Sequence, residues 1–248
     1  MLDLLLGAVD RSLTTMTTGG ARRNADVSFS SFFTLGEHPS PVWGVWLGDI
    51  AHNLRSALDN VVTALLARED KRPGGRAGFP LYLMKDDWLA KVAEPWPRGG
   101  PLAGVAREDF DVIESAQPFM HQSAEEKSGH PLATLARVNN RDKHAALHAT
   151  LTMLASEPQR VLGTDPPARV EILWSASPLT PLESGMEITR WRVLDPVQRG
   201  RVFLNWPLKV IFMDHKGQSV GFWELEGIHS AVSDLVNRWD GDGRLRTT

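Results

Sequence analysis

The polar side chains of residues 47–66 form the pattern in this sequence that is best suited to chemistry. His52, Arg55 and Asp59 are spaced three and then four residues apart, which places them along one line on the surface of a helix. Asp59 can then pair with Arg55 across one turn, and His52 can bond from the turn before. An imidazole moves protons near neutral pH, and a guanidinium holds anions. The spacing therefore predicts a site built on His52, Arg55 and Asp59.

An amphipathic helix over residues 47–66 must position these side chains, because at about 100° per residue the apolar and polar residues separate onto two sides. The apolar side consists of Leu47, Ile50, Leu54, Leu58, Val61 and Leu65. The polar side consists of Asp49, His52, Arg55, Ser56, Asp59 and Thr63, with Asn53 and Asn60 at its margin. Such short polar residues compete with the helix backbone for hydrogen bonds, so a face rich in them indicates side chains that bond one another or a ligand. Two other interpretations stay open: a polar network that only docks the helix, and a solvated face.

A second polar stretch, NRDKHAALHATLTML, carries His144 and His148 four residues apart. On a helix the two imidazoles would lie within about 6 Å of each other and could share a metal ion. The alternation of apolar residues with threonine instead favours a strand from about residue 146, which separates the two histidines by about 13 Å. Asp49 and His52 have a carboxylate–imidazole spacing suited to one ion, but no second such motif follows. We therefore expect no metal and no cofactor.

The composition of the 248 residues excludes several classes of function. The chain has no cysteine, which rules out disulfides, thiolate catalysis and cysteine-ligated zinc. Its formal net charge of −3 gives no overall attraction to nucleic acid or to an anionic membrane. The best local basic patch is the Gly-rich stretch 68–80, with Arg68, Lys71, Arg72 and Arg76, which is typical of a surface loop. No basic segment precedes the apolar opening, and no run approaches the roughly 18 apolar residues of a membrane span. These features predict a cytoplasmic protein with no membrane partner.

The order of the predicted elements indicates an α+β protein. A helical part is expected over residues 1–145 around the central helix 47–66. An antiparallel sheet of about four or five strands and a closing C-terminal helix are expected over residues 146–248. The predicted helices are 1–17, ended by Gly19 and Gly20, a short one at 86–93, 107–117, one that begins at Pro131, and 228–239. The predicted strands are 26–34, one from about residue 146, 169–176, 186–194, 201–214 and 218–225.

Four short segments, in this order and spacing, resemble a family of uncharacterised bacterial proteins. They are GDIAHNLRSALDN, FP at 79–80, IESAQPF and NNRDKH. The resemblance covers roughly residues 40–148 and implies no activity, but it does imply that the residues it shares form one site. Those residues are His52, Asn53, Arg55, Asp59, Asn60, Gln117, Asn140, Asp142, Lys143 and His144.

The central segment also resembles the Arg-x4-His element of HEPN domains, helical proteins of which many cleave RNA. This resemblance implies that Arg55 stabilises the scissile phosphate and that residue 60 is the general acid or base. Residue 60 is an asparagine here, which exchanges no proton near neutral pH, so His52 or His144 would have to take the role. The resemblance implies RNA or a nucleotide as the partner and a homodimer as the assembly.

Three functions stay open at this stage, and the sequence does not decide whether the protein is an enzyme. The first is metal-independent RNA cleavage or nucleotide binding, in which Arg55 and Lys143 hold phosphate and His52 or His144 moves the proton. The second is a small-molecule pocket between the helices and the sheet. The third is a non-enzymatic interaction or assembly protein whose polar residues are structural. In the first two, the substrate-binding residues are expected to be Asn53, Gln117, Asn140, Asp142 and Lys143.

Overall fold

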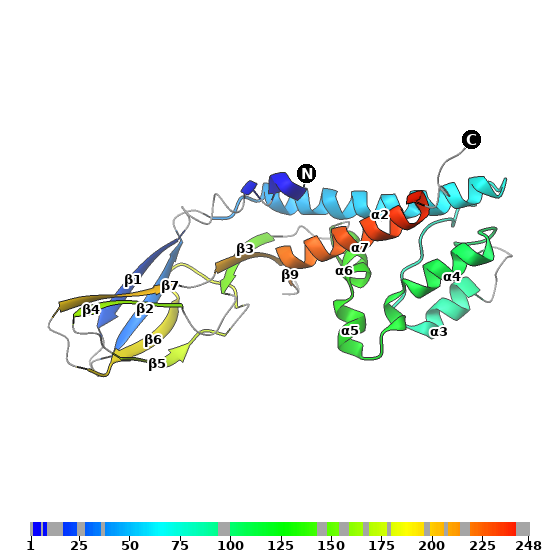
Figure 1. Cartoon of the computed structure of the whole chain (residues 1–248). Helices are drawn as coiled ribbons and strands as arrows, with labels where there is room; N and C mark the ends of the chain where they lie inside the picture. Colours follow the sequence, from blue (N-terminus) through cyan, green and yellow to red (C-terminus); the bar gives the residue numbers. More distant parts are fainter. Residues whose placement is uncertain are drawn as a thin grey trace. The chain divides into compact units, whose positions relative to one another are not determined.

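The computed structural model describes residues 2–5, 7–8, 17–23, 28–35, 38–93, 100–142, 148–153, 159–165, 169–177, 180–195, 199–205, 208–213 and 219–241 (Figure 1). The chain forms two compact units, and each combines segments that are distant in sequence. The first comprises Met1–Gly44 and His148–Gly221, and the second comprises Val45–Leu147 and Phe222–Thr248. Residues 1–44 thus group with the strands and the closing helix groups with the helices, a different division from the sequential one expected from the pattern.

The first unit is built from antiparallel strands. Their bounds are β1 Thr17–Arg23, β2 Phe29–Leu35, β3 His148–Met153, β4 Gln159–Asp165, β5 Val170–Ser175, β6 Glu187–Val193, β7 Arg199–Asn205, β8 Leu208–Met213 and β9 Ser219–Gly221. The described strands form a sheet of order β1-β2-β6-β5, a sheet of order β3-β8-β9, and the pair β4-β7. Trp191 of β6 stacks on Phe29 of β2 with ring centroids 4.7 Å apart. This ring pair reinforces the central strand pairing of the four-stranded sheet.

The strands confirm part of the predicted pattern and correct the rest. The predicted strand from about residue 146 is β3, and it includes His148. The predicted stretch 201–214 contains two strands, β7 and β8. Pro207, expected at an edge or a bend, lies outside the described residues. The prediction of a helix up to residue 17, ended by Gly19 and Gly20, is wrong at its end. Both glycines belong to β1 and lie opposite Phe33 and Phe32 in its register with β2.

The second unit is helical. Its elements are α2 Val42–Arg68, whose first turn belongs to the first unit, α3 Lys85–Trp88, the π-helical turn η1 Leu89–Ala93, α4 Arg107–Ser115, the 3-10 turn η2 Pro118–Met120, α5 Ala124–Gly129, α6 Pro131–Asp142 and α7 Phe222–Gly241. The predicted central helix is α2, which begins directly after Pro41 because a proline disfavours helix in the residue before it. The closing helix α7 begins six residues before the predicted position 228, so the expected strand 218–225 ends at Gly221.

The core of the helical unit confirms the apolar side of α2. Leu47, Leu58 and Leu65 are fully buried, and of the six predicted core residues only Leu54 is half-buried. Asp109 of α4, fully buried, accepts hydrogen bonds from Arg68 at 2.5 Å and from the Trp239 indole at 3.0 Å. One carboxylate therefore joins α2, α4 and α7, and its charge is compensated inside the core as a buried charge requires.

Helices α6 and α7 contact each other, and Arg137 pairs with Glu224 across this contact at 3.6 Å.

Helical and antiparallel-strand elements together confirm the predicted α+β class. Within the described ranges, no helix combines the length and the apolar character needed to cross a bilayer.

Candidate functional site

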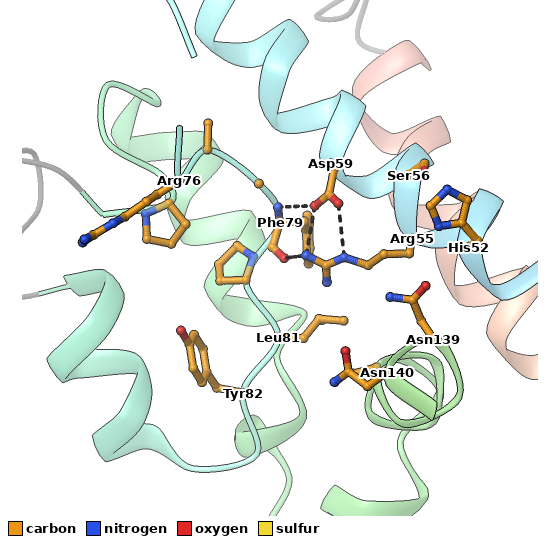
Figure 2. Close-up of a pocket in the computed structure, with 15 residues that line it drawn as sticks. His52, Arg55, Ser56, Asp59, Arg76, Phe79, Leu81, Tyr82, Asn139 and Asn140 are labelled. Carbon is orange, nitrogen blue, oxygen red and sulfur yellow. Dashed lines mark hydrogen bonds and ion pairs between the residues drawn. The ribbon is translucent and has the colours of Figure 1, made fainter. Parts of the chain in front are cut away.

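The Arg55–Asp59 pair that the spacing predicts is present on α2, and it does more than bridge one helical turn. Arg55 donates from Nη2 to Asp59 Oδ1 at 2.9 Å and from Nε to Oδ2 at 3.3 Å. The backbone N–H of Phe79 donates to the same Oδ1 at 2.8 Å, and Arg55 Nη2 also donates to the Phe79 carbonyl oxygen. Figure 2 shows these bonds converging on Phe79. The pair therefore holds the backbone of the loop that follows α2.

Gly78 makes this close approach of loop to helix possible. A Cβ atom at position 78 would lie 3.1 Å from Asp59 Oδ1, which is tighter than ordinary van der Waals contact. Asp59 cannot withdraw without weakening its bonds to Arg55 and to Phe79. The glycine is thus needed for space, because any side chain would push the carboxylate out of position.

Gln117 holds the other end of the same loop. Its side chain is fully buried. Oε1 accepts from the backbone N–H of Tyr82 at 3.1 Å, and Nε2 donates to the carbonyl oxygens of Pro80 at 2.9 Å and Ile113 at 3.0 Å. The amide therefore has partners at both of its polar atoms and positions the loop rather than a substrate. The segments FP and QP of the resemblance meet at this point.

Between α2, this loop and α6 lies a pocket of about 500 Å³ (Figure 2). The loop supplies residues 76–82, and Pro101 and Ala136 complete the apolar lining. Its polar side chains come from all three segments: they are His52, Arg55, Ser56, Asp59, Arg76, Tyr82, Asn139 and Asn140. Because both ends of the loop are bound to helices, the wall of the pocket is fixed by the fold.

Asn139 of α6 is the polar group that faces this pocket from the core. The residue is only 6% exposed, and its side chain makes no hydrogen bond within the described part of the chain, so its amide is accessible from the pocket and not sealed in the core. Figure 2 shows its amide directed towards Arg55 and His52. The sequence analysis missed this residue and selected its neighbour Asn140. A signal was available, because Asn139 lies one turn after Leu135 on the buried side of α6.

Four of the predicted site residues line the pocket: His52, Arg55, Asp59 and Asn140. Asn53 and Asn60 are exposed on α2 and do not line it. Asp142 is the last residue of α6, and its side chain lies beyond what the structure describes. Lys143 and His144 lie outside the described residues. The lining of the pocket thus joins three of these residues of α2 to one of α6, while the contribution expected from Lys143 and His144 stays a prediction.

The electrostatics of the lining favour anions. Asp59 is its only carboxylate within the described residues, and Arg55 compensates it. Arg76 also lines the pocket, is exposed, and has no ion-pair partner in the described ranges. Two arginines against one aspartate leave one positive charge in excess. Asp49 is exposed outside the lining, and the described residues contain no group of three or more side chains suited to hold a metal ion.

In comparisons with known proteins, no family model, no curated protein and no solved structure matched this chain. The fold and the site by themselves define an α+β protein with a polar, weakly cationic pocket in its helical unit.

Proposed function

We propose that the protein binds a small polar molecule in the pocket formed by α2, the loop 76–82 and α6. The observation that carries this proposal is Asn139, a residue only 6% exposed that lines the pocket and whose amide has no protein partner in the described part of the chain. Buried polar groups in native proteins are nearly always hydrogen-bonded. Because Asn139 lines the pocket, the hydrogen-bond partners of its amide come from the pocket, as water or as a ligand.

The size and the rigidity of the pocket support the same conclusion. Its volume of about 500 Å³ falls in the range of roughly 300–1,000 Å³ that is typical of small-molecule sites. The Arg55–Asp59 pair and Gln117 fix its wall through bonds within the protein. A wall that is already in place costs less conformational entropy on binding than one that must form.

Metal-independent RNA cleavage draws less support from this geometry. Two of the three guanidinium nitrogens of Arg55 already donate to Asp59 and to the Phe79 carbonyl. Asn60, in the position of the HEPN acid or base, is exposed and outside the lining. Binding of a single nucleotide would still fall within the proposal, because it needs the pocket and no proton transfer.

The proposal is tested by screening a metabolite library of phosphates, carboxylates, nucleosides and sugars for compounds that raise the melting temperature of the protein. For each such compound, calorimetric titration compares the wild type with Asn139→Leu, which keeps the side-chain volume and removes the amide. We expect an affinity loss of about tenfold or more, the effect of one hydrogen bond to an enclosed group.

Asn60→Leu is the matched control, because Asn60 is an asparagine of the same unit outside the pocket, and it should leave the affinity unchanged. Asn140→Leu tests the same pocket from an exposed position if the change at 139 prevents folding. A screen in which every compound binds equally well to the wild type and to the variants at 139 and 140 would overturn the proposal.

A further inference from the structure

The pocket has two chemically different sides. Figure 2 shows Arg76 on one side and His52, Asn139 and Asn140 on the other. The first side offers a cation without an ion-pair partner in the described residues. The second offers two carboxamides and an imidazole, which donate and accept hydrogen bonds without adding a fixed charge. A ligand that satisfies both sides must carry two kinds of group.

The lining between these sides is nearly neutral. The charges of Arg55 and Asp59 compensate each other across their 2.9 Å contact. Leu81, Pro80 and Pro101 add apolar surface to the same wall. No further charge of either sign lines this middle region in the described part of the chain. The position of the net positive charge is therefore set by Arg76 alone.

We infer that the ligand is an anion with two chemically different ends. A phosphate or carboxylate group binds at Arg76, and an uncharged group that donates and accepts hydrogen bonds binds at Asn139 and Asn140. This inference rests on the proposed function and adds the chemical class of the ligand. A guanidinium matches the planar oxygens of both anions and can bind either through two parallel hydrogen bonds. Phosphate esters of sugars or nucleosides and carboxylates of polar amides or heterocycles have this two-part chemistry.

Three pairs of probes test the inference. In each pair one member is neutral, and the other carries a phosphate or carboxylate group. They are ribose and ribose 5-phosphate, adenosine and adenosine 5′-monophosphate, and succinamide and succinamate. We expect the anionic member of at least one pair to bind the wild type about tenfold more tightly than its neutral counterpart by calorimetric titration. The phosphate and carboxylate pairs show which anion the pocket takes.

Arg76→Gln is expected to reduce the difference within a pair to about twofold and to leave the affinity for the neutral member unchanged. Arg72→Gln is the matched control, because Arg72 is an exposed arginine of the same loop outside the lining. It removes the same charge from the protein and should leave the difference within the pair unchanged. Raising the salt concentration from about 0.05 M to about 0.5 M should weaken only the anionic member, because the exposed guanidinium is screened.

Equal binding of both members of every pair, or equal losses in Arg76→Gln and Arg72→Gln, would overturn the inference. So would the absence of binding by all six probes. The proposed function has a separate readout. It fails only when the compounds found in the library screen bind the wild type and the variants at Asn139 and Asn140 with equal affinity. If a neutral library compound loses affinity in Asn139→Leu, the proposed function is supported, and the inference of an anionic ligand is overturned.

Discussion

The backbone N–H of Phe79 donates a 2.8 Å hydrogen bond to Asp59, a carboxylate 20 residues earlier in the chain. The same carboxylate oxygen accepts from Arg55, which in turn donates to the carbonyl oxygen of Phe79. The backbone of one residue, Phe79, is thus held through both its N–H and its C=O by two side chains of α2. Through these bonds, the polar side of α2 and the loop it holds together line the pocket.

Replacing Asp59 by leucine should destabilise the helical unit. The substitution removes the acceptor for Phe79 N–H and leaves the half-buried guanidinium of Arg55 without its ion pair. We expect the free energy of unfolding to fall by about 1–3 kcal/mol in urea titrations. Asp49→Leu is the control, because Asp49 is exposed on the same helix and outside the pocket. Equal losses in both variants would show that the bond to Phe79 contributes nothing.

Gly78→Ala should shift the loop away from α2. The new Cβ would lie 3.1 Å from Asp59 Oδ1, so either the carboxylate or the loop must move by a few tenths of an ångström. We expect a loss of about 1 kcal/mol in unfolding free energy, with a weaker affinity for whatever compound the pocket binds. Gly75→Ala is the matched variant, since nothing lies within 4 Å of a Cβ there. If Gly75→Ala destabilises as much as Gly78→Ala, the close approach to Asp59 is not the cause.

Local periodicity predicted the helix α2, its buried side and the pairing of Arg55 with Asp59, because each depends only on residues a few positions apart. It did not predict what the pair holds. The loop 69–84 has no periodicity, so only the structure shows that Phe79 reaches Asp59. Gln117 was expected among the substrate-binding residues, and the structure instead has its amide bonded to the backbone of Pro80 and outside the lining of the pocket.

Two errors have the same physical origin. Gly19 and Gly20 were predicted to end a helix, yet they lie in β1, paired with Phe33 and Phe32 of β2. Asn139 was not among the predicted site residues, and its place in the lining becomes visible only when α2 and the loop are placed against α6. In both cases a residue distant in sequence determines the role of the position. A single sequence does not display such pairs.

Gln117→Leu should be the most damaging substitution in the wall of the pocket. Leucine fits the volume but leaves the N–H of Tyr82 and the carbonyl of Pro80 without their partners in a buried setting. Unsatisfied buried groups cost about 1–3 kcal/mol each, so we expect a loss of at least about 2 kcal/mol in chemical denaturation. Gln117→Glu keeps the acceptor for Tyr82 and loses the donor to Pro80. Its free energy of unfolding should therefore also be lower than that of the wild type at neutral pH. A stable Gln117→Leu protein would show that the loop is held by Asp59 alone.

The helical unit should lose stability as the pH falls from 7.5 to 5.5, and His130 should be one cause. Its Nδ1 accepts the backbone N–H of Leu132 at 3.2 Å, as the side chain of an N-cap residue does at the start of α6. This bond requires an unprotonated Nδ1. Burial lowers the pKa of His130, and the neighbouring His121, with ring centroids 5.0 Å apart, lowers it further.

A folded-state pKa below the unfolded value of about 6.5 means that the unfolded chain binds the proton more readily. The contribution of His130 is therefore complete above the unfolded pKa and is lost as the pH falls towards the folded pKa. Protonation also removes the cap on Leu132, an interaction of about 1 kcal/mol. His130→Asn should keep the cap, because the asparagine oxygen accepts the same N–H without titrating. In urea titrations at both pH values, the free energy of unfolding should change less with pH in His130→Asn than in the wild type. His229→Asn is the control, because His229 is an exposed histidine on α7, and it should leave this pH dependence unchanged. An unaltered pH dependence in His130→Asn would mean that other groups cause the loss.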